Sequence, residues 1–192
     1  MQSLLLPTGV VALAEIGDKT QLLAFLLAAR FKKPVPIVLG ILLATLVNHG
    51  LAGALGAWIT TALRPEVLRW ILGASFIAMA VWTMIPDKIE EEESDIARRF
   101  GVFGATLITF FIAEMGDKTQ IATVAMAAHY GAPVAVVIGT TLGMLIVDVP
   151  AVFAGEKLAA KIPMKLVHGI AAVLFAAMGV ATLLGAGAGF GL

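Results

Sequence analysis

The sequence predicts an all-α integral membrane protein whose six transmembrane helices form two inverted three-helix repeats. Composition indicates the membrane class, because 60% of the 192 residues are hydrophobic and 14% are charged, against about 45–50% and about 25% in soluble domains. An internal repeat, described below, indicates the arrangement. The formal net charge of zero argues against nucleic acid as a partner. Because the chain has no cysteine, disulfides and thiolate metal sites are excluded.

Six apolar segments approach the roughly 20 residues that a helix needs to cross a bilayer. The predicted spans are Leu6–Ala29, Val35–Ile59, Val67–Ile85, Phe103–Ala128, Val134–Gly155 and Leu166–Gly185. Prolines fall at or near the ends of these spans, where a missing backbone N–H is harmless. The prolines in question are Pro34, Pro65, Pro86, Pro133 and Pro163.

The two halves of the chain align without gaps at an offset of 99 residues. The pattern Glu-x-Gly-Asp-Lys-Thr-Gln occurs at Glu15–Gln21 and again at Glu114–Gln120. Each predicted unit holds three spans, and because three is odd, the second unit enters the membrane from the opposite side. We therefore expect a first three-helix repeat over 1–86, an acidic linker over 87–101 and a second, inverted repeat over 102–192.

Basic residues in the loops predict the orientation of the chain. Nine of them are predicted on one side of the membrane, and only Arg64 and Arg69 on the other. The nine are Arg30, Lys32, Lys33, Lys88, Arg98, Arg99, Lys157, Lys161 and Lys165. This bias places both termini outside and the linker in the cytoplasm. The linker, with its run Glu90–Glu93, is interpreted as a solvated connection, and cation collection or regulation is the alternative.

Both motifs lie near the middle of an apolar segment. Burying their charges in hydrocarbon costs several kcal/mol, so such groups usually line a polar pathway or an ion site. In a continuous helix the two carboxylates and the lysine of each motif would share one face, and an inverted repeat would bring both sets together near the bilayer centre. These residues are Glu15, Asp18, Lys19, Glu114, Asp117 and Lys118. The glycine inside each motif permits close backbone approach or local unwinding.

The charges of the motifs indicate the ligand. Four carboxylates and two lysines sum to −2, which one divalent cation or two protons would neutralise, as a cation/proton exchanger requires. Thr20, Gln21, Thr119 and Gln120 add hydroxyl and amide oxygens, and oxygen ligands suit Mn²⁺, Ca²⁺ or Mg²⁺ better than Zn²⁺ or Cu⁺. No permanently bound cofactor is predicted. Each lysine either pairs with a motif carboxylate, which we favour, or acts as a resident cation in the empty site.

Three further polar residues lie within predicted spans. Asn48 and His49 fall near the centre of the second span, and Asp148 occupies the repeat position of His49 in the fifth. Asp148 is interpreted either as a fifth carboxylate or proton carrier at the site, or as an interhelical hydrogen-bonding group. His49 is a weaker candidate ligand, because no second histidine lies at ligand spacing.

At these residues the chain resembles the calcium/manganese:cation antiporter family, in which Glu-x-Gly-Asp-Lys-Thr occurs in the first and fourth of six spans. That family includes Golgi and chloroplast manganese transporters and bacterial manganese exporters, and the resemblance covers essentially the whole chain. It implies that Glu15, Asp18, Glu114 and Asp117 bind the transported ion. It also implies close neighbours at Lys19, Thr20, Gln21, Lys118, Thr119 and Gln120, and Asn48 and Asp148 are added from the span analysis. The compact chain is similar to the bacterial branch, which implies Mn²⁺ efflux across the inner membrane.

The expected function is secondary transport in metal homeostasis: export of Mn²⁺, with Ca²⁺ left open, in exchange for H⁺ or another cation by alternating access. A divalent cation channel of the same architecture is one alternative. A small-metabolite exporter is another, although a net-negative pocket suits carboxylate-bearing substrates poorly. An enzyme is not predicted, because the chain has no nucleophile–base pair or His-rich metal motif. The expected partners are the lipid bilayer and a divalent metal ion, and a homo-oligomer is left open.

Overall fold

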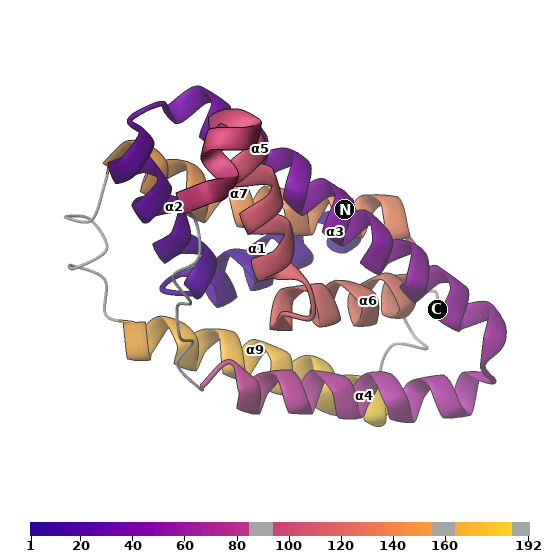
Figure 1. The fold of residues 1–192 in the computed structure, drawn as a ribbon. Coiled ribbons are helices and arrows are strands. Elements are labelled where there is room, and N and C mark those ends of the chain that lie inside the picture. Colours follow the sequence, from indigo (N-terminus) through magenta and orange to yellow (C-terminus); the bar gives the residue numbers. More distant parts are fainter. Residues whose placement is uncertain (85–93, 155–163, 186–192) are drawn as a thin grey trace.

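In the computed structural model, residues 1–84, 94–154 and 164–185 are described, and every regular element among them is a helix. This agrees with the predicted all-α class. In chain order the helices are α1 (Gln2–Glu15), α2 (Lys19–Phe31), α3 (Pro34–Ala62), α4 (Pro65–Trp82), α5 (Ser94–Glu114), α6 (Lys118–Tyr130), α7 (Pro133–Ala154) and α9 (Met164–Leu183) (Figure 1).

Three of these helices, α3, α4 and α7, are long and apolar enough to cross a membrane. The part of α5 from Phe100 onward forms a fourth candidate span together with α6, and this pair is bent by 70° at a short break. Helix α9 is apolar over Gly169–Leu183. The predicted second, third, fifth and sixth spans thus each correspond to one helix.

The first and fourth predicted spans, by contrast, are each divided into two helices, so the motif residues do not lie along one continuous helix. The breaks fall at Gly17 and Gly116, whose φ angles are 83° and 76°. A residue in this left-handed region turns the chain out of the helical path, and glycine adopts it without a steric penalty. The local unwinding that the motif glycines permit is therefore the arrangement observed.

Several sequence predictions concern residues outside the described part of the chain. Most of the linker predicted over 87–101 lies there, including Glu90–Glu93, and so do Lys157, Lys161 and Pro163. The end of the predicted linker is described as the first part of α5, which is interrupted at Gly101 with φ 68°.

Helix packing repeats itself between the two halves. Helix α1 packs against α7, and at the corresponding positions of the other half α5 packs against α3; α3 also packs against α7, and α4 against α9. Glycines allow the close approaches. A Cβ atom on Gly143 of α7 would lie 2.6 Å from the Thr8 carbonyl oxygen of α1, and one on Gly40 of α3 would lie 2.7 Å from Thr106 Cβ of α5.

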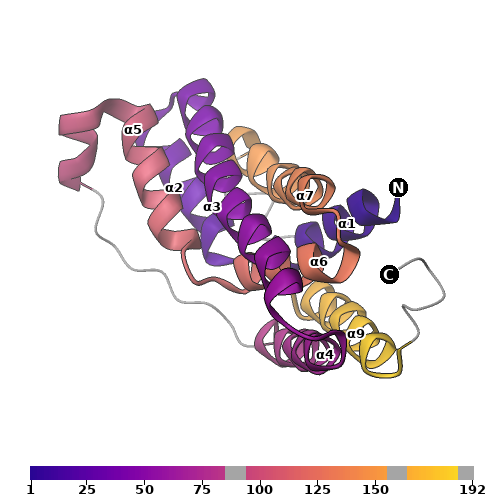
Figure 2. The ribbon, with the colours of Figure 1, turned by 90° about the vertical axis from the view of Figure 1, so that its right-hand side faces the viewer.

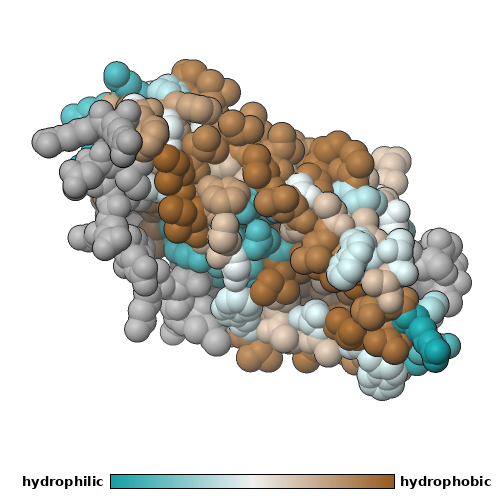
Figure 3. All heavy atoms as spheres, turned by 45° about the vertical axis from the view of Figure 1, so that its right-hand side comes forward, coloured by the Kyte–Doolittle hydropathy of each residue, from teal (hydrophilic) through white to brown (hydrophobic). Residues whose placement is uncertain are grey.

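Helices α4 and α9 lie side by side along one edge of the bundle (Figures 1 and 2), where they also contact α6 and α1 respectively. Many hydrophobic side chains of the described helices are exposed, among them Trp58, Trp70 and Val134. One face of the molecule is mostly hydrophobic, with hydrophilic residues visible in a hollow among the hydrophobic ones (Figure 3). Such an apolar exterior around a polar interior is typical of a protein surrounded by lipid.

Candidate cation site

The two motifs fold alike around their glycines. In each, the glutamate is the last residue of one helix, and the aspartate is the N-cap of the next; these residues are Glu15 and Asp18, and Glu114 and Asp117. The C-terminal ends of α1 and α5 therefore face the breaks together with the N-terminal ends of α2 and α6. Helix C-termini leave backbone carbonyl groups without intrahelical partners, and these carry partial negative charge that favours cations.

The glutamine of each motif stabilises the break. The backbone N–H of Gly17 donates to Gln21 Oε1 at 2.8 Å, and that of Gly116 donates to Gln120 Oε1 at 2.7 Å. The first of these hydrogen bonds is partly buried and the second is exposed. Gln21 and Gln120, which the sequence suggested as ligand neighbours, thus support the backbone turn.

The threonine of each motif hydrogen-bonds to the glutamate of the same motif. Thr20 Oγ1 donates to Glu15 Oε2 at 2.6 Å, and Thr119 Oγ1 donates to Glu114 Oε1 at 2.5 Å. Both glutamates are buried, and their other oxygens have no hydrogen-bond partner within the described ranges. One oxygen of each glutamate thus remains available to a cation.

The lysine of each motif pairs with the aspartate of the other motif. Lys118 Nζ forms an ion pair with Asp18 Oδ1, and Lys19 Nζ lies 2.9 Å from Asp117 Oδ1. Asp18 and Lys118 are fully buried, whereas the Lys19 side chain is 26% exposed. The pairing with a motif carboxylate that we favoured is the arrangement found, but the sequence did not indicate that it would cross between the halves.

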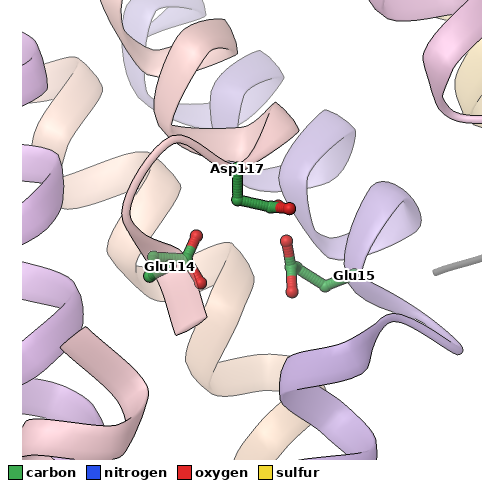
Figure 4. Close-up of side chains that lie close together, drawn as sticks. All are labelled: Glu15, Glu114 and Asp117. Atoms are coloured by element: carbon green, nitrogen blue, oxygen red, sulfur yellow. The ribbon is translucent and has the colours of Figure 1, made fainter. Parts of the chain in front are cut away.

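Three carboxylates converge between the breaks. Glu15 at the end of α1, Glu114 at the end of α5 and Asp117 before α6 each offer an oxygen, and these oxygens lie within 4.8 Å of one another (Figure 4). Asp18 lies nearby but pairs with Lys118. Three buried carboxylates at such distances repel one another, and a divalent cation among them would offset that repulsion. The donor set is made of oxygen atoms and fits Mn²⁺, Ca²⁺ or Mg²⁺.

Two residues of α3 flank the carboxylates. Asn48 Nδ2 donates to the Phe111 carbonyl oxygen at 3.1 Å, and Asn48 Oδ1 accepts from Gln120 Nε2 at 3.2 Å, so Asn48 links α3 to α5 and α6. His49 Nε2 lies 3.7 Å from Glu114 Oε1. From the sequence, His49 was a weak candidate ligand, because no second histidine lies at ligand spacing. Its repeat relation to Asp148 was the signal that pointed to this position.

Asp148 in α7 is fully buried, and in the described structure neither of its carboxylate oxygens has a hydrogen-bond partner. It interacts electrostatically with Glu15 and Glu114. Its carboxylate is not one of the three that converge within 4.8 Å. Asp148 lies in α7, which packs against α1, the helix that ends at Glu15.

The sequence of the chain matches one family profile and several curated proteins. The profile of the family described as "Divalent cation/proton antiporter GDT1" matches residues 3–91 and 102–189. No solved structure is significantly similar to the chain.

Curated relatives come from bacteria and plants. A Vibrio cholerae protein named "Putative manganese exporter" is 50% identical over 183 residues, which cover 95% of this chain and 90% of the relative. "GDT1-like protein 3" of Oryza sativa subsp. indica is 31% identical over an alignment that covers 86% of this chain and 68% of the relative. A GDT1-like protein of Synechocystis is 30% identical over 86% of this chain and 89% of its own. The family is one of transporters and not of enzymes, and the chain belongs to it: this is a member of the GDT1 family of divalent cation/proton antiporters.

Proposed function

We propose that this protein exports Mn²⁺ from the cytoplasm in exchange for H⁺, and that Glu15, Glu114 and Asp117 hold the cation during transport. The observation that carries the proposal is the convergence of their three carboxylates, buried between two helix breaks, with oxygens within 4.8 Å of one another. The manganese preference rests on the likeness to the Vibrio cholerae protein named "Putative manganese exporter", and Ca²⁺ is the second candidate because it accepts the same ligands.

Charge balance supports exchange against protons. The ion pairs Lys118–Asp18 and Lys19–Asp117 each sum to zero. Of the motif charges, those of Glu15 and Glu114 then remain, and either one divalent cation or two protons would neutralise them. Export of a divalent cation against a negative-inside potential of about 100 mV costs about 4.6 kcal/mol, at about 2.3 kcal/mol per charge. Coupling to inward proton movement would supply this free energy.

The proposed architecture is six membrane crossings in two inverted units, with α1–α2 and α5–α6 each forming one broken crossing. The corresponding contacts of α1 with α7 and of α5 with α3 support it, as do the two profile matches over 3–91 and 102–189. In the proposed cycle the two units rock around the site so that it opens alternately to each side. The bias of basic loop residues supports placing both termini outside a bacterial inner membrane.

Transport in proteoliposomes tests this function. Vesicles that contain the purified protein and Mn²⁺ are given an imposed pH gradient, and Mn²⁺ efflux is followed with a metal-sensitive dye. We expect the pH gradient to accelerate efflux, and both Glu15→Gln and Asp117→Asn to abolish it. Glu66→Gln is the matched control, since Glu66 is an exposed carboxylate in the first turn of α4, and it should transport like the wild type.

Two results would contradict the proposal, and a third would extend it to Ca²⁺. Full transport by Glu15→Gln would remove that residue from the site. A flux that is indifferent to the pH gradient and far above carrier rates would indicate the channel alternative. Competition by Ca²⁺, at concentrations equal to those of Mn²⁺, would show that the site accepts both ions, since size and rigidity rather than ligand type separate them.

A further inference from the structure

Asp148 is a buried acid whose surroundings do not explain it. The residue is 0% exposed, and none of the described residues forms a hydrogen bond with either of its carboxylate oxygens. Asn48, which is equally buried, shows the usual situation, because its amide both donates and accepts a hydrogen bond. Buried polar groups are nearly always paired, and an unpaired buried carboxylate is strongly unfavourable. An interhelical hydrogen bond, the structural role considered from the sequence, therefore does not account for Asp148.

The neighbours of Asp148 increase this cost. Helix α7 packs against α1 and α3, and Asp148 interacts electrostatically with two glutamates of the cluster, Glu15 and Glu114. All three groups carry the same sign of charge when ionised, so they repel one another. Each of these glutamates also has one oxygen without a hydrogen-bond partner in the described part of the chain. A cation is the ligand that would satisfy several such oxygens at once.

The motif itself leaves a ligand position open. Of the four motif carboxylates, Asp18 is engaged in the fully buried ion pair with Lys118. Only three carboxylates, those of Glu15, Glu114 and Asp117, converge. Ca²⁺ takes six to eight oxygen ligands in proteins, so a cation of this class bound by the cluster has room for further donors.

We propose that Asp148 is a further ligand of the transported divalent cation, supplied by α7 to the site in place of the motif aspartate that Lys118 holds. The inference rests on the proposed function and extends it to a residue outside both motifs. Ligands would then come from α1, from both sides of the α5–α6 break and from α7. Binding of the cation would draw α7 toward the cluster and so link the occupancy of the site to the packing of α7 on α1.

The repeat-related position supports a role in the site. His49 corresponds to Asp148 at the offset of 99 residues, and its Nε2 lies 3.7 Å from Glu114 Oε1. Position 49 thus neighbours the cluster from α3, and Asp148 lies in α7, which packs against both α1 and α3. The two halves carry different residues there, so the site receives an additional carboxylate from one half only.

The test is Mn²⁺ binding by the purified full chain in lipid nanodiscs, measured by titration calorimetry, with thermal unfolding recorded with and without Mn²⁺. Asp148→Asn should weaken Mn²⁺ binding by about tenfold, because affinity follows the number of charged ligands. Without metal its melting temperature should equal or exceed that of the wild type, since an unpaired buried charge is removed. The Mn²⁺-induced rise in melting temperature should shrink. Glu66→Gln is the control for loss of an acidic group, and Asp148→Ser repeats the test if the asparagine variant does not fold.

Each outcome bears on the inference. Weakening of Mn²⁺ binding by fivefold or more, with an unchanged or higher metal-free melting temperature, supports it. A smaller change in affinity, in a wild type that binds Mn²⁺ and loses binding through Glu15→Gln, overturns the inference and leaves the proposed function intact. A lower metal-free melting temperature in both Asp148 variants also overturns it, because it assigns Asp148 a structural role. If the wild type does not bind Mn²⁺, the proposed function fails first, and the inference fails with it.

Discussion

Replacement of Lys118 by methionine would remove one partner of the fully buried ion pair with Asp18. Both side chains are 0% exposed, so the remaining carboxylate would have no access to water. Removing one partner of a buried ion pair costs about 3–5 kcal/mol, because the other charge stays buried without compensation. We expect the free energy of unfolding of Lys118→Met to fall by this amount.

The repeat-related lysine provides the matched comparison. Lys19 lies 2.9 Å from Asp117, but its side chain is 26% exposed, so solvent already screens this pair. Loss of a hydrogen bond to a charged group costs about 1.5–3 kcal/mol. The loss of unfolding free energy in Lys19→Met should lie at or below the lower end of that range. The double variant Lys118→Met/Asp18→Asn should recover most of the loss, because it removes both charges.

Unfolding in mixed detergent micelles, followed by fluorescence of the three tryptophans, measures these differences. The reasoning would be refuted if Lys118→Met cost no more than Lys19→Met. It would also be refuted if the double variant were as unstable as Lys118→Met, since the cost would then come from lost packing of the lysine side chain and not from the unpaired carboxylate.

Two further predictions concern the backbone and the packing of the helices. Lys32 follows the last residue of α2 and has a φ angle of 52°, in the left-handed region that strains a residue with a side chain; the corresponding residue after α6 is Gly131. Lys32→Gly should therefore raise the free energy of unfolding by about 1 kcal/mol. An unchanged free energy of unfolding would contradict backbone strain at Lys32. Gly143→Ala should lower it by about 1–3 kcal/mol, because the new Cβ would meet the Thr8 carbonyl oxygen at 2.6 Å. Gly50→Ala is the control for Gly143→Ala, since a Cβ at Gly50 meets no atom within 4 Å. Helix propensity predicts that Gly50→Ala raises the free energy of unfolding by up to about 1 kcal/mol. Equal effects of the two substitutions would contradict the packing argument.

Sequence patterns predicted the helical class, four of the apolar segments that form single helices and the proximity of the two motifs. They left open whether the motif glycines would unwind the helices, because glycine within an apolar segment is common and does not by itself end a helix. The evidence for a break lay in the combination of a glycine with a glutamine four residues later, since Gln21 and Gln120 accept the N–H groups of the two glycines.

The contacts of the motif residues depend on those breaks and could not be derived from helical periodicity. In a continuous helix, residues four apart face each other, which favours a pair between Glu15 and Lys19. The broken chain instead brings Glu15 to Thr20, five residues away, and sends Lys19 to Asp117 of the other motif. Partners that lie about 100 residues apart follow only from the packing of the two halves.

The crossed pairing of the lysines has an evolutionary consequence. Because Lys118 neutralises Asp18 while Lys19 neutralises Asp117, a charge-altering substitution in one half of the gene leaves a defect in the other half. Compensation must then arise at the distant partner and not at a neighbouring codon. Neither half of the chain alone can form these two ion pairs, because each pair takes its lysine from one half and its aspartate from the other.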